Sequence, residues 1–214
     1  KPRQEYQLDV MYFIEPNSDL KQYKRFDGVA PKTFARNKGL KYGLVCVDIF
    51  TKYADVEPMR RKTAKETTEA VLRIFQRMGK PETVYTGGGS EFLGEFLQKM
   101  IELNIKPIMT MTHASFAEVF IKTFKNKLYP YMNRVGTKTY YNIVDKIVKN
   151  YNNAEHSVIK MTPVEATDPN NEDEVRKNIH DAYLKKKYRL VRREALKVGD
   201  YVRYLVKREG FAKD

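Results

Sequence analysis

Hydrophobic and polar positions follow two different periods in the first half of the chain. Short runs rich in β-branched and aromatic residues predict strands at residues 6–13, 42–50, 53–58, 83–86 and 105–109. Apolar residues spaced for one side of a helix predict helices at residues 63–78 and about 90–104. Strands and helices in this order predict an α/β domain with a long insertion near residues 15–40.

The ends and inner faces of these helices can also be predicted. Thr63 and Glu66 have the T-x-x-E spacing of a capping box, and Gly79 and Pro81 stop the first helix. In the second helix, the apolar residues expected to point inward are Leu93, Phe96, Leu97, Met100 and Ile101.

The second half of the chain is predicted to be helical. One helix at residues 115–133 carries an apolar stripe with a spacing of four, made of Phe116, Phe120, Phe124 and Leu128. A further helix at residues 139–153 would bury Ile143, Val144, Ile147, Val148 and Tyr151. We expect residues 167–187 to be a linker and residues 188–214 to begin a small β domain.

A row of polar residues lies about 200° around the helix from the stripe at residues 115–133. Glu118 begins the row, and Lys122, Lys125 and Tyr129 continue it. On spacing alone, an ordinary surface pair of glutamate and lysine is the favoured interpretation. The alternative is an acid that faces an active site, with lysines alongside it to hold phosphates.

Charge narrows the choice of partner. The chain has 40 Lys and Arg against 27 Asp and Glu, which gives a net charge of +13. Such an excess suggests a polyanionic partner, although a solvated basic surface is about equally probable on charge alone. The single cysteine, Cys46, lies in a strand pattern and is expected to be a core residue. No apolar run approaches the length of a membrane span, and no signal peptide is evident.

Six segments, in order along nearly the whole chain, resemble the motifs of retroviral-type integrases, most closely those of Polinton (Maverick) elements and related transposons. They are residues 7–10 (QLDV), 47–54 (VDIFTKYA), 86–92 (TGGGSEF), 113–118 (HASFAE), 151–166 (YNNAEH to TPVEA) and 196–203 (LKVGDYVR). The resemblance implies an RNase H-like core at residues 1–166, with a mixed five-stranded sheet and flanking helices. It also implies that residues 188–214 begin an SH3-like or chromodomain-like DNA-binding region.

The same resemblance implies chemistry with two Mg²⁺ or Mn²⁺ ions, which prepare a nucleophile and stabilise the leaving oxygen at a DNA phosphate. Three carboxylates hold such ions in this family, and they map to Asp9, position 87 and Glu118. Position 87 is glycine, which has no side chain with which to bind metal. We therefore expect Asp9 and Glu118 to be the remaining catalytic and metal-binding residues, with weakened or absent metal binding.

The family also implies contacts with double-stranded DNA, assembly into homo-oligomers and a nuclear or intracellular location. The basic residues expected to contact DNA are Lys122, Lys125, Arg192, Arg193 and Arg203. A related departure is Val119, because related elements tend to carry arginine after the catalytic glutamate. His113, His156 and His180 are isolated, and with one cysteine they make no structural zinc site.

Three functions remain open from the sequence. The favoured one is a DNA-binding protein of an integrase or transposase lineage whose catalysis is impaired at Gly87. The second is an active strand transferase with a substitute metal ligand, for which Glu91 and Asp48 are poor candidates. The third is a domesticated binding or scaffold protein without enzymatic activity.

Overall fold

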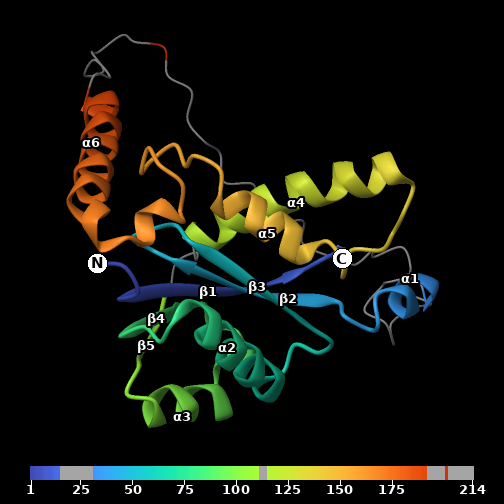
Figure 1. The fold of residues 1–214 in the computed structure, drawn as a ribbon. Coiled ribbons are helices and arrows are strands. Elements are labelled where there is room, and N and C mark those ends of the chain that lie inside the picture. The colour runs from blue at the N-terminus through green and yellow to red at the C-terminus, as the bar shows by residue number, and fades with distance from the viewer. Residues whose placement is uncertain (15–30, 111–114, 192–200, 202–214) are drawn as a thin grey trace. The chain divides into compact units, whose positions relative to one another are not determined.

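A five-stranded mixed sheet forms the centre of the computed structural model, which describes residues 1–14, 31–110, 115–191 and 201. The strands are β1 (Glu5–Tyr12), β2 (Tyr42–Asp48), β3 (Ala54–Met59), β4 (Thr83–Thr86) and β5 (Lys106–Met109). Their order is β3-β2-β1-β4-β5 (Figure 1). The β1–β2 and β2–β3 pairs are antiparallel, whereas the β1–β4 and β4–β5 pairs are parallel.

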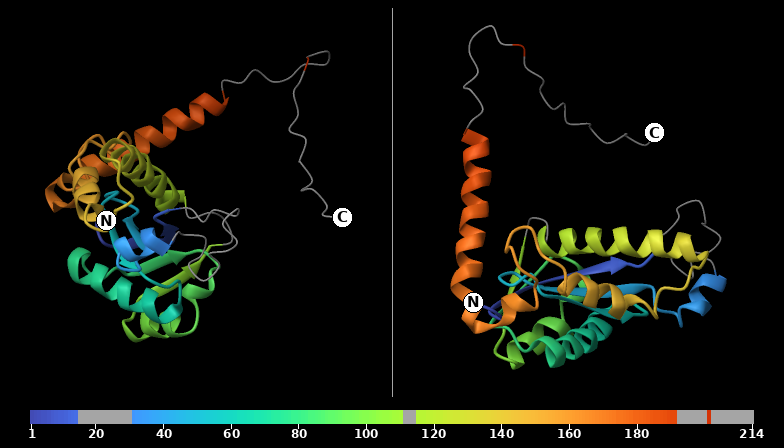
Figure 2. Two further views of the ribbon diagram at one scale, coloured as in Figure 1. Left: turned by 90° about the vertical axis from the view of Figure 1, so that its right-hand side faces the viewer. Right: turned by 45° about the horizontal axis from the view of Figure 1, so that its top comes forward.

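Helices cover both faces of the sheet. Helices α2 (Ala64–Met78) and α3 (Glu95–Glu102) lie on one face, and α4 (Ser115–Val135) and α5 (Val144–Asn152) lie on the other (Figures 1 and 2). Successive strand residues point to opposite faces, so Cys46 packs in the core beneath α2 while Val45 and Val47 pack beneath α4 and α5. The predicted α/β class and its order of elements are confirmed, and Cys46 is fully buried.

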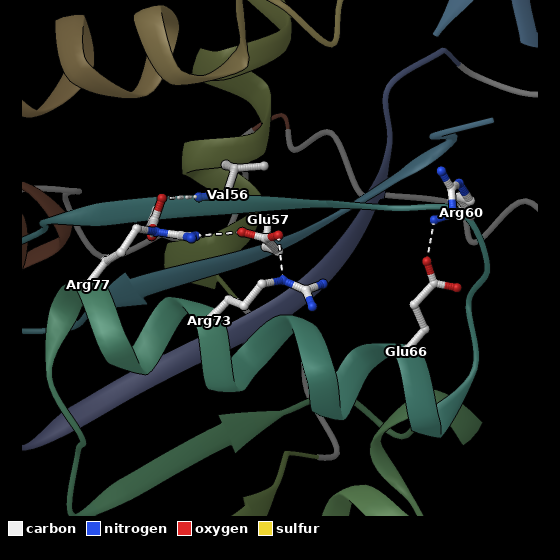
Figure 3. A network of polar contacts seen from close by, with 7 residues as sticks. Val56, Glu57, Arg60, Glu66, Arg73 and Arg77 are labelled. Atoms are coloured by element: carbon white, nitrogen blue, oxygen red, sulfur yellow. Dashed lines mark hydrogen bonds and ion pairs between the residues drawn. The ribbon is translucent and has the colours of Figure 1, made fainter. Parts of the chain in front are cut away.

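Edge strand β3 is tied to α2 by a ladder of ion pairs (Figure 3). Arg77 contacts Asp55 at 2.6 Å and Glu57 at 2.8 Å, and Arg73 contacts Glu57 at 2.7 Å. One half of the predicted capping box of α2 is present, because Thr63 accepts a hydrogen bond from the backbone N–H of Glu66 at 3.4 Å. The carboxylate of Glu66 accepts from the backbone of Arg60 and Arg61.

The helix predicted at residues 90–104 is divided into two pieces. A 3₁₀ turn, η2 (Ser90–Phe92), comes first, and α3 begins only at Glu95. Gly94 separates them with a φ of +53°, a left-handed conformation that glycine adopts readily. The predicted inward face is therefore wrong at Leu93 and Ile101, which are 38% and 66% exposed, whereas Phe96 and Met100 are fully buried.

Part of the predicted insertion is a short helix, α1 (Pro31–Arg36), and residues 15–30 lie outside the described residues. Asn37, which follows α1, is fully buried. Its side chain donates to the carbonyls of Thr33 and Lys138 and accepts from the N–H of Tyr140 at 2.8 Å. These bonds hold residues 138–140 outside a helix, so α5 starts at Val144 rather than near residue 139.

The chain beyond α5 continues through η3 (Glu165–Thr167) and η4 (Pro169–Asn171) into α6 (Glu172–Val191). Contacts divide the chain into two units, residues 1–179 and 180–214. A small core of Ile159, Ala166 and Val175 belongs to the first unit, so this unit includes residues 167–179 of the predicted linker.

Residues 188–191 are the last turn of α6, so the strand expected to start at residue 188 is wrong there. The remainder of the predicted SH3-like region lies outside the described residues, apart from Tyr201. Arg192, Arg193 and Arg203 fall in that part of the chain. In the described ranges, no helix is long and apolar enough to cross a membrane.

Candidate active site

Asp9 lies on β1 just beyond the point where this strand stops pairing with β4. The last parallel pair joins Gln7 to Tyr85, and β4 ends one residue later at Thr86. Extending this register by two residues pairs Asp9 on β1 with Gly87, the first residue after β4, so we place the two next to one another at the end of β4. Asp9 is partly buried, and its Oδ1 accepts a hydrogen bond from the N–H of Val10 at 2.8 Å.

Helix α4 is fixed against the same strand by Gln7. The side-chain oxygen of Gln7 accepts hydrogen bonds from the backbone N–H groups of Phe116 at 2.7 Å and Ala117 at 3.1 Å. The first N–H groups of a helix have no partner within the helix, so a β1 side chain satisfies two of them. Gln7, two residues before Asp9, thereby determines where the first turn of α4 and its Glu118 lie.

The structure brings Asp9 and Glu118 together. Both line one open hollow of about 500 Å³, whose wall is continued along α4 by Lys122, Lys125 and Tyr129. Glu118 is exposed, while Ala117 and Phe120 on the opposite side of the helix are buried. The polar row predicted from sequence therefore faces this hollow. Tyr129 departs from the row because it also packs against the core.

Electrostatics support the closeness of the two acids. Burial raises the pKa of the Asp9 carboxyl, and the negative charges of Glu118 and Glu91 raise it further. The hydrogen bond from Val10 and the positive charge of Lys62 lower it. A carboxylate surrounded by other carboxylates in a partly buried position attracts cations.

Glycine is not required at position 87 by the backbone. Gly87 is not among the glycines with positive φ, and a Cβ built on it would meet no atom within 4 Å. Gly88 has room as well, because its Cβ would lie 3.9 Å from the Sδ of Met109. A side chain at position 87 would therefore begin in open space, without displacing a neighbour at its Cβ.

Two further charged residues beside the acids were not identified as a pair from the sequence. Glu91 lies in η2 and is 4% exposed, and its Oε1 is 3.0 Å from the Nζ of Lys62. Both charges affect the pKa of Asp9. Lys62 gives no sequence signal of its own, because it is one of several basic residues before the cap of α2.

Asp48, the other acid considered from the sequence, has a structural role. It is 2% exposed and accepts backbone hydrogen bonds from Arg3, Phe50 and Thr51 at 2.8–3.1 Å. These bonds shape the turn between β2 and β3 and leave the carboxylate buried. His156 likewise accepts from the backbone of Val158 within its own turn.

The carboxylates at this site are better suited to bind one divalent cation than two. Among the described residues, no group of three or more Asp, Glu, His or Cys side chains is placed to hold a metal ion. Asp9 and Glu118 supply carboxylates from two elements, and Mg²⁺ is commonly bound by one or two carboxylates together with water and phosphate. The site therefore lacks the third carboxylate that would complete a pair of metal sites.

Comparisons with known proteins identify chains that are similar to this one in sequence or in fold. No family model matches the chain. A putative transposon-derived protein of Caenorhabditis elegans is 26% identical over 133 residues, 60% of this chain and 46% of that protein. The retrovirus-related Pol polyprotein of the Drosophila melanogaster transposon gypsy is 25% identical over 166 residues, 74% of this chain and 15% of that protein.

The chain spans less than half the length of these curated relatives. Among solved structures, the HTLV-2 integrase catalytic core in complex with magnesium, in a trimeric form, has a TM-score of 0.60 and 20% identity. The similarity covers 78% of this chain and 97% of that one. The chain therefore has the RNase H-like fold of the retroviral integrase catalytic core, and its relatives in sequence include transposon-derived proteins.

Proposed function

We propose that this chain is the core of an integrase- or transposase-type protein that binds double-stranded DNA and is catalytically impaired at Gly87. The observation that carries the proposal is the convergence of Asp9 and Glu118 in one hollow. The register of β1 and β4 supports a place for Gly87, whose Cβ direction is open, next to Asp9. Two carboxylates at the end of a sheet with lysines beside them suit a phosphodiester and the cation that activates it.

The reaction of the lineage would be a transesterification at phosphorus. A DNA 3′-hydroxyl would lose its proton and attack a phosphodiester, forming a new P–O bond. The P–O bond to the leaving 3′-oxygen would break, and that oxygen would take up a proton. A bound divalent cation would supply positive charge that offsets repulsion between the phosphate and the nucleophile. In this chain, Asp9 and Glu118 are the residues that would hold such a cation, and Lys122 and Lys125 would contact the phosphates.

The impairment follows from the missing third ligand. With glycine at position 87, Asp9 has no carboxylate beside it at the end of β4 to share a second cation. Glu91 is a poor replacement, because its carboxylate is buried and paired with Lys62 at 3.0 Å. This pairing favours an impaired enzyme over an active one that uses Glu91 as a substitute ligand.

We also propose that this chain contacts DNA phosphates, forms a homo-oligomer and comes from a mobile element. Lys122 is exposed, and it lines the acid hollow with Lys125, as expected of phosphate contacts. The HTLV-2 core is described in a trimeric form, which supports our proposal of a homo-oligomer here. The sequence motifs support an origin in a Polinton-like element and a nuclear or intracellular location.

Restoring the acid at position 87 is the experiment that tests the function. We expect Gly87→Asp to join a labelled DNA duplex to a plasmid with Mn²⁺ or Mg²⁺, while the native chain has little or no activity. Electrostatic stabilisation by a metal contributes several kcal/mol, so the gain should be about 100- to 1,000-fold. Gly88→Asp is the matched control, because it adds the same acid one residue away where a side chain also fits.

The other outcomes distinguish the alternatives. Equal activity in the native chain and in Gly87→Asp would indicate a substitute ligand and contradict impairment. Activity in neither, together with DNA affinity that barely changes with salt, would favour a scaffold protein, because phosphate contacts make binding salt-dependent. Glu118→Gln in the Gly87→Asp background should abolish any activity that is gained.

A further inference from the structure

The loop that follows β4 contains an acidic side chain folded back over its own backbone. Glu91 lies two residues after the last of the three glycines and is 4% exposed although it carries a charge. A Cβ built on Gly89 would lie 2.5 Å from the Cδ of Glu91, which is too close for two atoms that are not bonded. The carboxylate of Glu91 therefore occupies the space that a side chain at residue 89 would need.

Lys62 compensates the charge of this buried carboxylate. Its Nζ is 3.0 Å from the Oε1 of Glu91, and the two side chains are 37% and 5% exposed. Lys62 belongs to the connection between β3 and α2, directly before the N-cap residue Thr63. Leaving a buried carboxylate without a partner is costly, so the ion pair ties the glycine loop to the start of α2.

The ion pair is close to the acid site. Glu91 raises and Lys62 lowers the pKa of Asp9, so both charges lie within electrostatic range of its carboxyl. The same loop presents Gly87 level with Asp9 across the end of β4. Three segments of the first unit therefore meet here: the end of β4, the start of α2 and the middle of β1.

We infer that the Lys62–Glu91 ion pair is a clamp that positions the glycine loop, so that a side chain at residue 87 would face Asp9 and Glu118. This inference rests on the proposed function. Both clamp residues act through the loop and neither supplies the missing ligand. The clamp accounts for the arrangement of the glycine-loop backbone. The Cβ direction of Gly87 is open, while that of Gly89 is filled by Glu91.

Mn²⁺ affinity in the restored background tests the clamp without depending on catalysis. Free Mn²⁺ is followed by electron paramagnetic resonance in the full chain carrying Gly87→Asp, alone and combined with Lys62→Met. Residues that orient metal ligands typically contribute a factor of roughly 10–100 in affinity, and we expect a loss of that size. Lys62→Arg should retain most of the affinity, because it keeps the charge and the hydrogen-bond donors.

A matched control comes from the ladder on α2 (Figure 3). Arg73 pairs with Glu57 at 2.7 Å with side-chain exposures of 43% and 16%, a geometry similar to that of Lys62 and Glu91. Arg73→Met in the Gly87→Asp background should leave Mn²⁺ affinity unchanged, even where it lowers the melting temperature. If Lys62→Met does not fold, Glu91→Gln removes the same charge pair with little change in volume and should lower affinity similarly.

The outcomes separate the clamp from the function on which it rests. Gly87→Asp with improved Mn²⁺ affinity that Lys62→Met leaves unchanged would overturn the clamp alone. A rise in affinity on Lys62→Met would also overturn it, because Lys62 would then be a cation that competes with the metal. No gain in affinity from Gly87→Asp would contradict the acid site itself, and the clamp with it.

Discussion

Asp9 lies where its own charge is disfavoured, which is common for residues retained for chemistry rather than stability. It is partly buried and lies within electrostatic range of two other carboxylates, Glu118 and Glu91. One hydrogen bond from Val10 and the charge of Lys62 offset this only in part. A site that collects negative charge stabilises a bound cation at the expense of the apoprotein.

Replacing Asp9 by asparagine should raise the melting temperature at neutral pH. Burial first, and then the charges of Glu118 and Glu91, raise the pKa of Asp9 above 3.8, so folding disfavours its ionised form. The resulting loss of stability begins as the pH rises past 3.8 and is complete above the raised pKa. The advantage of Asp9→Asn should therefore shrink as the pH is lowered toward 3.8. Identical melting curves at neutral pH would contradict this account of the site.

At the level of elements, the link between β1 and the N-terminus of α4 fixes the position of Glu118 relative to Asp9. The side-chain oxygen of Gln7 accepts from Phe116 and Ala117, and this one side chain places the helix turn that carries Glu118. Gln7 is 6% exposed, so water cannot easily replace it. The site depends on this contact as much as on the acids themselves.

Gln7→Leu should destabilise the fold by about 1–3 kcal/mol, because it leaves the buried N–H of Ala117 and the partly buried N–H of Phe116 without their acceptor. Gln7→Glu is the paired variant: a carboxylate at a helix N-terminus still accepts both bonds and favours the helix dipole, so most of the stability should remain. Urea unfolding of both variants measures the difference. Equal losses in the two would show that the acceptor at residue 7 does not hold α4.

Local patterns predicted α2, β4 and the overall α/β order, because caps and apolar spacing are properties of neighbouring residues. They failed at residues 90–104, where Gly94 was a local sign of a break but the apolar spacing favoured one continuous helix. The start of α5 depends on Asn37, which lies about a hundred residues away and cannot be read from the helix itself. The same limit applies to the site: motifs indicate Asp9 and Glu118, but the roles of Gln7 and Lys62 require the fold.

For the molecule as a whole, the first unit combines an RNase H-like frame with an acid site that lacks one side chain. The sheet order brings β1 between β2 and β4, so Asp9 faces the loop after β4 on one side and α4 on the other. The core, the capping of α4 and the Lys62–Glu91 pair are all in place around Gly87. In this account, one substitution separates the native chain from a complete set of three acids.

The central claim is that Asp9 and Glu118 converge on one site, and the most direct measurement of it is the pKa of Asp9. NMR titration of the Asp9 carboxyl carbon follows this pKa. In the native chain the pKa should lie above the ordinary value of 3.8, in part because Glu118 faces Asp9 across the hollow. Glu118→Gln removes that negative charge and should lower the pKa of Asp9. A pKa that does not change on Glu118→Gln would mean that the two acids do not share a site, and the assignment would be wrong.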